Sequence, residues 1–133
     1  MGGEGSASNE SRGRAMKRPE DFDGIYLHRE PVDFRMWVNG LSSIVEGEMK
    51  LDPFSRNLFV FTNRNRTRLK ILYWDQTGYA VWFKKLEKDK FPWPRKFTED
   101  VVKIRPRELN WLLEGYEYWK LKPHSVVEYA CVS

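Results

Sequence analysis

The sequence predicts an α+β fold, in which a small antiparallel β-meander of three to four strands packs with an N-terminal helix and a C-terminal helix. Three observations predict it. Apolar residues recur at helical spacing after Asp33, three short runs rich in β-branched and aromatic residues follow one another closely, and Pro106 introduces a second helical pattern. Sequential strands with short links favour an antiparallel meander.

The first predicted helix follows a short strand at residues 24–28, which Pro31 ends because proline has no N–H for a strand ladder. Asp33 is the expected N-cap of this helix. A single apolar stripe then runs along it, formed by Phe34, Trp37, Val38, Leu41, Ile44 and Val45. Gly40 and Gly47 each weaken the helix by roughly 1 kcal/mol relative to alanine. Close approach of another element is one physical reason for glycines at these positions.

The three strand candidates are residues 58–62, 69–74 and 79–83, and turn-forming residues separate them. Asp75 is expected to begin a four-residue turn, because aspartate favours that position. Alternation along the middle strand places one set of side chains on one face, namely Arg68, Lys70, Leu72 and Trp74, and Leu69, Ile71 and Tyr73 on the other. In the last helix, the expected buried face consists of Leu109, Leu112, Leu113 and Tyr116.

A chain of 133 residues is long enough for one ordinary domain. We expect a disordered tail over residues 1–18, one domain over 19–119 and a C-terminal extension over 120–133. No apolar run approaches the length of a membrane span, and the first 14 residues lack the apolar stretch of a secretory signal. Cys131 is the single cysteine, which suits a reducing compartment. These observations predict a cytoplasmic location.

Positive charge is concentrated in the middle of the chain. Residues 50–105 hold 14 Lys and Arg against 6 Asp and Glu, whereas residues 1–49 hold 6 against 9. Concentrated positive charge attracts polyanions, so nucleic acid is the leading candidate partner. The alternative is a solvated surface that happens to be basic.

Two basic clusters are the predicted nucleic-acid-binding residues. The first lies at the mouth of the predicted hairpin and consists of Arg64, Arg66, Arg68 and Lys70; the second consists of Lys84, Lys85, Lys88, Lys90, Arg95 and Lys96. Arginine forks suit phosphate oxygens, and lysines suit contact with the backbone whatever the sequence. Trp74 is a candidate for stacking on bases, with a core position as its alternative. Glu87 and Asp89 alternate with the lysines, which equally favours an ordinary charged turn.

No catalytic residue, metal site or cofactor is predicted. His28 and His124 lie far apart without a zinc-ligand pattern, and the sequence holds no glycine-rich phosphate loop and no nucleophile elbow. The protein is therefore expected not to be an enzyme. A two-metal nuclease needs only a few clustered carboxylates, and Asp75 is the one candidate for that role.

Several longer motifs occur together in a fixed order. They are the segments 30–35, 39–41, 51–55, 58–61, 68–75, 82–87 and Phe91-Pro92-Trp93-Pro94. Over about residues 20–118 the chain closely resembles the TnpB-type accessory protein, the second open reading frame, of insertion-sequence family sixty-six. It departs from that family's usual pattern at Arg35-Met36-Trp37, where a basic residue and a small residue normally follow the arginine.

The resemblance implies an accessory role in transposition, beside a separate transposase and a small helix-turn-helix protein of the same element. Three hypotheses follow. The protein assists assembly on element ends by binding DNA, or it is a protein–protein adaptor whose exposed aromatics, such as Trp37, Trp82 and Trp93, dock on the transposase. The third is a cryptic nuclease that depends on Asp75.

Overall fold

The computed structural model describes residues 18–94 and 97–117. These form a five-stranded sheet with strand order β4-β3-β2-β1-β5. The strands are β1 (Gly24–His28), β2 (Asn57–Thr62), β3 (Arg68–Asp75), β4 (Gly78–Lys85) and β5 (Val101–Ile104). The helices are the short 3-10 helix η1 (Pro19–Asp21), α2 (Val38–Gly47) and α3 (Pro106–Glu114).

The sheet is mixed, so the predicted antiparallel meander of three to four strands is only partly right. β2, β3 and β4 do form an antiparallel meander, but β1 runs parallel to β2 and β5 runs antiparallel to β1. A parallel pair needs a long crossover connection, which α2 supplies. The first helix is therefore internal, between β1 and β2, and not N-terminal as predicted.

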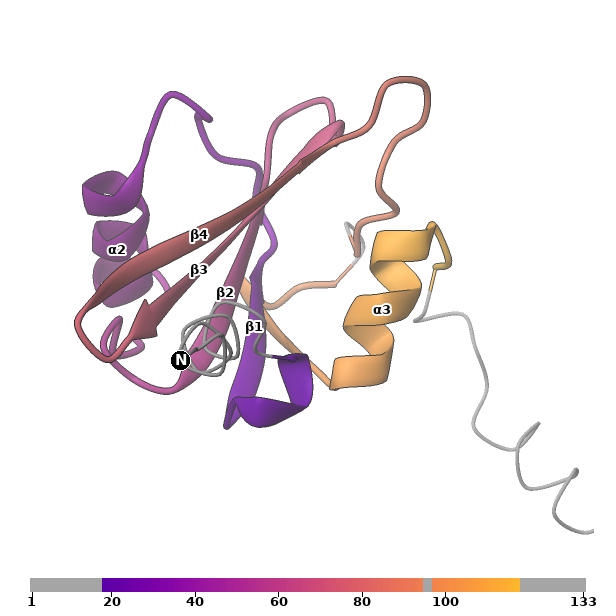
Figure 1. The fold of residues 1–133 in the computed structure, drawn as a ribbon. Helices are drawn as coiled ribbons and strands as arrows, with labels where there is room; N and C mark the ends of the chain where they lie inside the picture. The colour runs from indigo at the N-terminus through magenta and orange to yellow at the C-terminus, as the bar shows by residue number, and fades with distance from the viewer. Residues whose placement is uncertain (1–17, 95–96, 118–133) are drawn as a thin grey trace, which may run out of the picture.

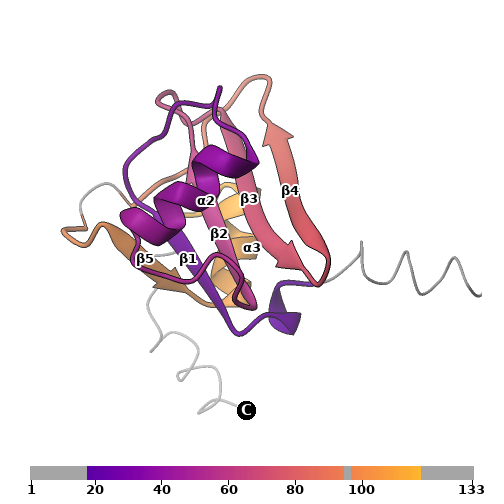
Figure 2. The same ribbon diagram turned by 90° about the vertical axis from the view of Figure 1, so that its left-hand side faces the viewer.

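The two helices cover opposite faces of the sheet (Figures 1 and 2). On one face Leu41, Ile44 and Val45 of α2 pack with Phe59, Phe61 and Leu72. On the other, Leu109 and Leu112 of α3 pack with residues that include Ile25, Val60 and Ile71. The predicted alternation along β3 is confirmed, because Leu69 and Ile71 belong to the α3 face whereas Leu72 belongs to the α2 face.

The predicted start of the first helix is wrong, because α2 begins at Val38. Asp33 Oδ1 accepts a hydrogen bond from Arg35 N (2.9 Å), and Met36 N donates to Asp33 O (3.0 Å). Asp33 therefore organises a turn before the helix instead of capping it. Phe34 and Trp37 consequently lie ahead of the helical stripe, and the Trp37 side chain is 55% exposed.

α3 begins at Pro106 as predicted and ends at Glu114, and the next residue, Gly115, has φ +102°. Such a left-handed residue after a helix is most often glycine, because it has no Cβ to clash. Tyr116 therefore lies beyond the helix and is 57% exposed, so its predicted place in the buried face is wrong. Asp75 ends β3 and pairs with Gly78, which confirms it as the first residue of a four-residue turn.

Candidate nucleic-acid interface

Three segments meet at one end of the sheet (Figure 1): residues 29–37, the hairpin loop between β2 and β3, and the loop that follows β4. Two backbone hydrogen bonds join the last two segments. Leu86 N donates to Thr67 O (2.8 Å), and Phe91 N donates to Arg66 O (2.7 Å). The loops that carry the two predicted basic clusters therefore lie side by side. We call the cations of these loops and of the adjoining strand ends the basic end: Arg64, Arg66, Arg68, Lys84, Lys85, Lys88 and Lys90.

Asn63 shapes the hairpin loop. Its Oδ1 accepts hydrogen bonds from Thr67 N (2.9 Å) and Arg68 N (3.0 Å), and its Nδ2 donates to Thr67 Oγ1 (3.1 Å). Arg66 N also donates to Asn63 O (3.0 Å), and Arg66 adopts a left-handed backbone with φ 59°. Because one side chain satisfies these backbone groups, the arginines between them can project from a defined loop.

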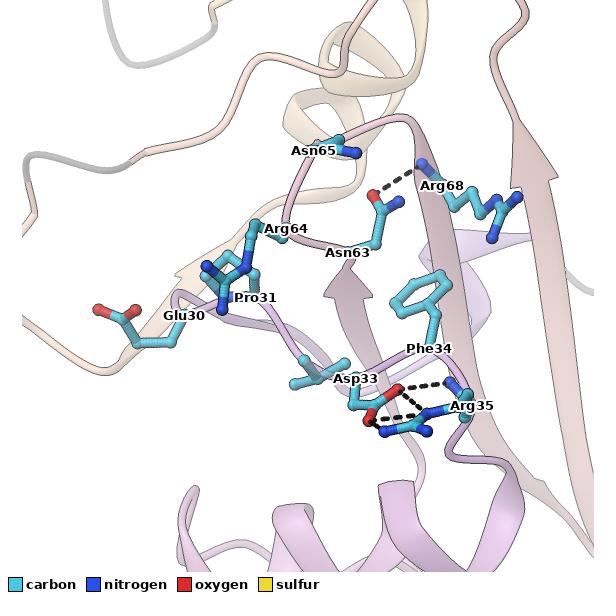
Figure 3. Close-up of a pocket in the computed structure, with 10 residues that line it drawn as sticks. Glu30, Pro31, Asp33, Phe34, Arg35, Asn63, Arg64, Asn65 and Arg68 are labelled. Carbon is cyan, nitrogen blue, oxygen red and sulfur yellow. Dashed lines mark hydrogen bonds and ion pairs between the residues drawn. The ribbon is translucent and has the colours of Figure 1, made fainter.

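Two clefts open beside this loop, and Arg64 borders both. The larger, of about 800 Å³, lies between residues 30–35 and residues 63–68 (Figure 3). Arg64 and Arg68 extend on either side of Asn63 in this view. The smaller cleft, of about 290 Å³, is also bordered by Arg29, Arg66 and Trp93. A groove with several guanidinium groups on its rim suits phosphate oxygens.

The acidic side chains of the clefts already have cationic partners. Asp33 Oδ2 lies 2.6 Å from Arg35 Nη2, and Glu30 Oε2 lies 3.0 Å from Arg29 Nη1. Hydrogen bonds from the side chain and backbone of Arg35 lower the pKa of Asp33 to about 2. In the part of the chain that the structure describes, no such ion pair involves Arg64, Arg66 or Arg68.

Lys70 is not part of this surface, which corrects its place in the predicted cluster. Its side chain is only 3% exposed, and its ammonium donates to Phe34 O (2.9 Å) and Met36 O (2.7 Å). The Nζ atom also lies 4.6 Å from the ring centre of Phe34 and 4.7 Å from that of Trp37. Alternation aims Lys70 at the α2 face, where residues 34–37 cover it.

Trp74 does not lie beside Arg68 and Lys70 as a stacking platform. It occupies the opposite end of β3 from Arg68, six residues away, or about 20 Å along an extended strand. Its ring is half-buried and meets Phe54 edge-on at 5.0 Å and Tyr79 edge-on at 5.1 Å. Alternation places Trp74 on the same face as the cations, but the six-residue spacing puts it at the other end of the strand from Arg68.

The remaining residues that the sequence predicted for binding differ in how exposed their side chains are. Lys85, Lys88 and Lys90 are exposed, and Lys84 is half-buried. Lys85 is the cross-strand partner of Arg68, which places a lysine of the second cluster beside an arginine of the first. Arg95 and Lys96 lie outside the described residues. Trp93, predicted as a docking aromatic of the adaptor, is 3% exposed and donates from Nε1 to Arg29 O (2.8 Å).

Arg29 and Arg35 border the clefts and were not among the predicted residues. A usable sequence signal was the pairing of each arginine with an acidic residue one or two positions away.

Within residues 18–94 and 97–117, no three His, Cys, Asp or Glu side chains gather as a metal site would require. None of the helices described there is long and apolar enough to cross a membrane.

The fold and this site define a class: a small sheet protein with a helix on each face and a cationic loop surface at one end. A model of the family described as IS66 Orf2 like protein matches residues 23–123. The chain therefore belongs to the IS66 Orf2-like family, the accessory proteins of IS66 transposition. The resemblance drawn from the sequence motifs is confirmed.

Two curated relatives support the assignment, both from Sinorhizobium fredii (strain NBRC 101917 / NGR234). Uncharacterized protein y4jC is 33% identical over 98 residues, which cover 74% of this chain and 83% of that protein. Uncharacterized protein y4hO is 33% identical over 94 residues, which cover 71% of this chain and 81% of that protein. No solved structure shows a significant match.

Proposed function

We propose that this protein assists IS66 transposition by binding DNA at the element ends through the basic end, with contacts to phosphates and not to base edges. The observation that carries the proposal is the joining of the two basic loops by the hydrogen bonds from Leu86 N and Phe91 N. These bonds bring cations from two separate stretches of sequence to one end of the sheet. Phosphate contact supplies most of the affinity in sequence-independent binding.

The test is fluorescence anisotropy of a labelled duplex, titrated with the full chain at several salt concentrations. Binding should weaken steeply with salt, and Arg64→Gln with Arg66→Gln should lower the log–log slope by about 0.9 for each phosphate that is no longer neutralised. The matched control is Arg56→Gln with Arg107→Gln, which removes the same charge from exposed arginines outside the basic end. Absence of binding at low salt, or an equal reduction in both double variants, would overturn the proposal.

A second candidate is an adaptor that docks on the transposase without touching DNA. The exposed Trp37 and Trp82 side chains favour it, because aromatic residues are enriched at interface hot spots. The small helix-turn-helix protein of the same element is a further candidate partner. A pull-down with the transposase separates the candidates: capture that survives nuclease and high salt but is abolished by Trp37→Ala favours the adaptor.

A further inference from the structure

β4 is an edge strand of the sheet that the described residues form. It ends the strand order, and among the described residues β3 is its only strand neighbour. Figure 2 shows it at the margin of the sheet, beyond the cover of the helices. In an antiparallel edge strand, alternate residues direct their N–H and C=O groups away from the sheet, where they can pair with another strand.

This edge is also long and aromatic. β4 spans Gly78–Lys85 without a proline, and its exposed side chains include Trp82 (43% exposed) and Phe83 (48% exposed). These two point to opposite faces, because Trp82 pairs with Ile71 of the α3 face and Phe83 pairs with Lys70 of the α2 face. A strand that paired with β4 would therefore bring its own side chains beside an aromatic side chain on each face of the sheet.

The charge along β4 is polarised. Lys84 and Lys85 end the strand, whereas its first residue, Gly78, pairs with Asp75. Burial is the main cause of the raised pKa of Tyr79, and the nearby carboxylates of Asp52 and Glu46 also raise it. One end of the strand is basic and the other lies among acidic groups. An antiparallel copy brings unlike ends together, whereas a parallel copy brings lysines beside lysines.

We propose that two copies of this chain pair through β4, antiparallel, so that their two sheets join into one. A twofold axis perpendicular to the sheet keeps the α2 faces of both copies on one side of the joined sheet. Odd-numbered residues of β4 must therefore lie opposite odd-numbered residues of the partner, and even-numbered opposite even-numbered. Placing Val81 on the axis sets Trp82 opposite the partner's Ala80 and Phe83 opposite the partner's Tyr79. Large side chains then meet small or aromatic ones, and no lysine faces a lysine.

The first measurement is sedimentation of the full chain over a concentration series, with an expected mass of twice 15.9 kDa. Trp82→Lys should weaken self-association by about 30-fold or more, the effect typical of an interface hot spot. Tyr116→Lys, which changes an exposed aromatic after α3, should leave it unchanged. A chain that stays monomeric throughout the series would overturn the proposal, and circular dichroism establishes that each variant is folded.

An engineered disulfide between the two copies tests whether β4 is the surface through which they pair. In a chain with Cys131→Ser, the variant Val81→Cys should form a covalent dimer on mild oxidation, because Cα atoms opposite each other lie about 4.5–5.5 Å apart. Tyr79→Cys is the control, since the two cysteines would lie about 13 Å apart along the strands. A dimer that links through Tyr79→Cys, or through neither variant, would show that another surface pairs and would overturn the proposal.

Discussion

Lys70 carries a positive charge into the interior, where two hydrogen bonds and two aromatic rings compensate it. Burial lowers the pKa of Lys70, and the neighbouring Arg68 lowers it further. The charged form is stabilised by the carbonyls of Phe34 and Met36, which accept hydrogen bonds from the ammonium group. Lys70 thereby fixes residues 34–37 across the α2 face and sets the chain direction into α2.

Lys70→Met should destabilise the fold by about 2–3 kcal/mol, because it leaves the carbonyls of the half-buried Phe34 and Met36 without this donor. Lys85→Met is the matched control. It removes an exposed lysine from the neighbouring strand and should change stability by no more than about 0.5 kcal/mol. Urea denaturation measures both. Equal stabilities of the two variants would contradict the structural role given to Lys70.

Asp33 provides a pH-dependent test of the turn before α2. Its hydrogen bonds with Arg35 lower its pKa from 3.8 to about 2. A carboxyl group with a lowered folded-state pKa stabilises the fold fully above about 3.8, and this contribution disappears as the pH falls through about 2. Arg35→Ala should return the pKa of Asp33 toward 3.8. An NMR titration of the Asp33 carboxyl carbon measures this, and an unchanged midpoint would contradict it.

At the scale of elements, the hairpin loop depends on Asn63. Asn63→Ala removes the acceptor of Thr67 N and Arg68 N and should cost about 1–2 kcal/mol. Asn63→Asp keeps an acceptor at the same place and removes only the donor to Thr67 Oγ1, so it should retain most of the stability. Thermal unfolding measured by circular dichroism compares them. An alanine variant as stable as the aspartate variant would contradict this account of the loop.

The two glycines of α2 should respond differently to alanine. A Cβ at Gly47 meets nothing within 4 Å, so Gly47→Ala should stabilise the protein by about 0.5–1 kcal/mol. A Cβ at Gly40 would lie 2.9 Å from Met36 Cγ, so Met36 must move and Gly40→Ala should bring no such gain. The expected close approach of another element is found at neither glycine, because the neighbour of Gly40 is Met36, just ahead of the helix. Denaturation midpoints that rank the variants in the reverse order would contradict this.

Local patterns predicted the elements with a strong periodic signal. The three meander strands, the apolar face of α2 and the start of α3 at Pro106 all follow from spacing and turn chemistry. The parallel pairing of β1 with β2 is a long-range contact, and the 24–28 pattern looks the same whichever neighbour the strand has. β5 has only four residues, too few for alternation to distinguish it from a loop. α2 begins later than predicted because Asp33 forms a turn with Arg35 and Met36, and Lys70 binds the carbonyls of this segment.

At the scale of the whole molecule, the sequence located charge but not its partners. It found both basic clusters, since loop composition is visible in the chain, and the structure brings these loops together. It could not show that Lys70 turns inward, because that depends on which segment covers the α2 face of the sheet. It also could not show that Arg29 and Arg35 reach the same clefts, because these arginines come from a distant stretch of sequence.

If the basic end binds DNA as one surface, the effect of a cation on binding should depend on its location in the structure and not on its place in the sequence. Lys88→Gln with Lys90→Gln should reduce the salt dependence of DNA binding about as much as Arg64→Gln with Arg66→Gln, by about 0.9 for each phosphate that is no longer neutralised. Removing all four should give the sum, because cations on separate phosphates release separate counterions. Lys50→Gln with Lys103→Gln removes the same charge outside the basic end and should leave the slope nearly unchanged. Anisotropy titrations over a salt series measure the slopes. If the salt dependence of binding changed only with the total charge removed, wherever the cations lie, the attraction would be diffuse. That result would contradict a defined DNA-binding surface at the basic end.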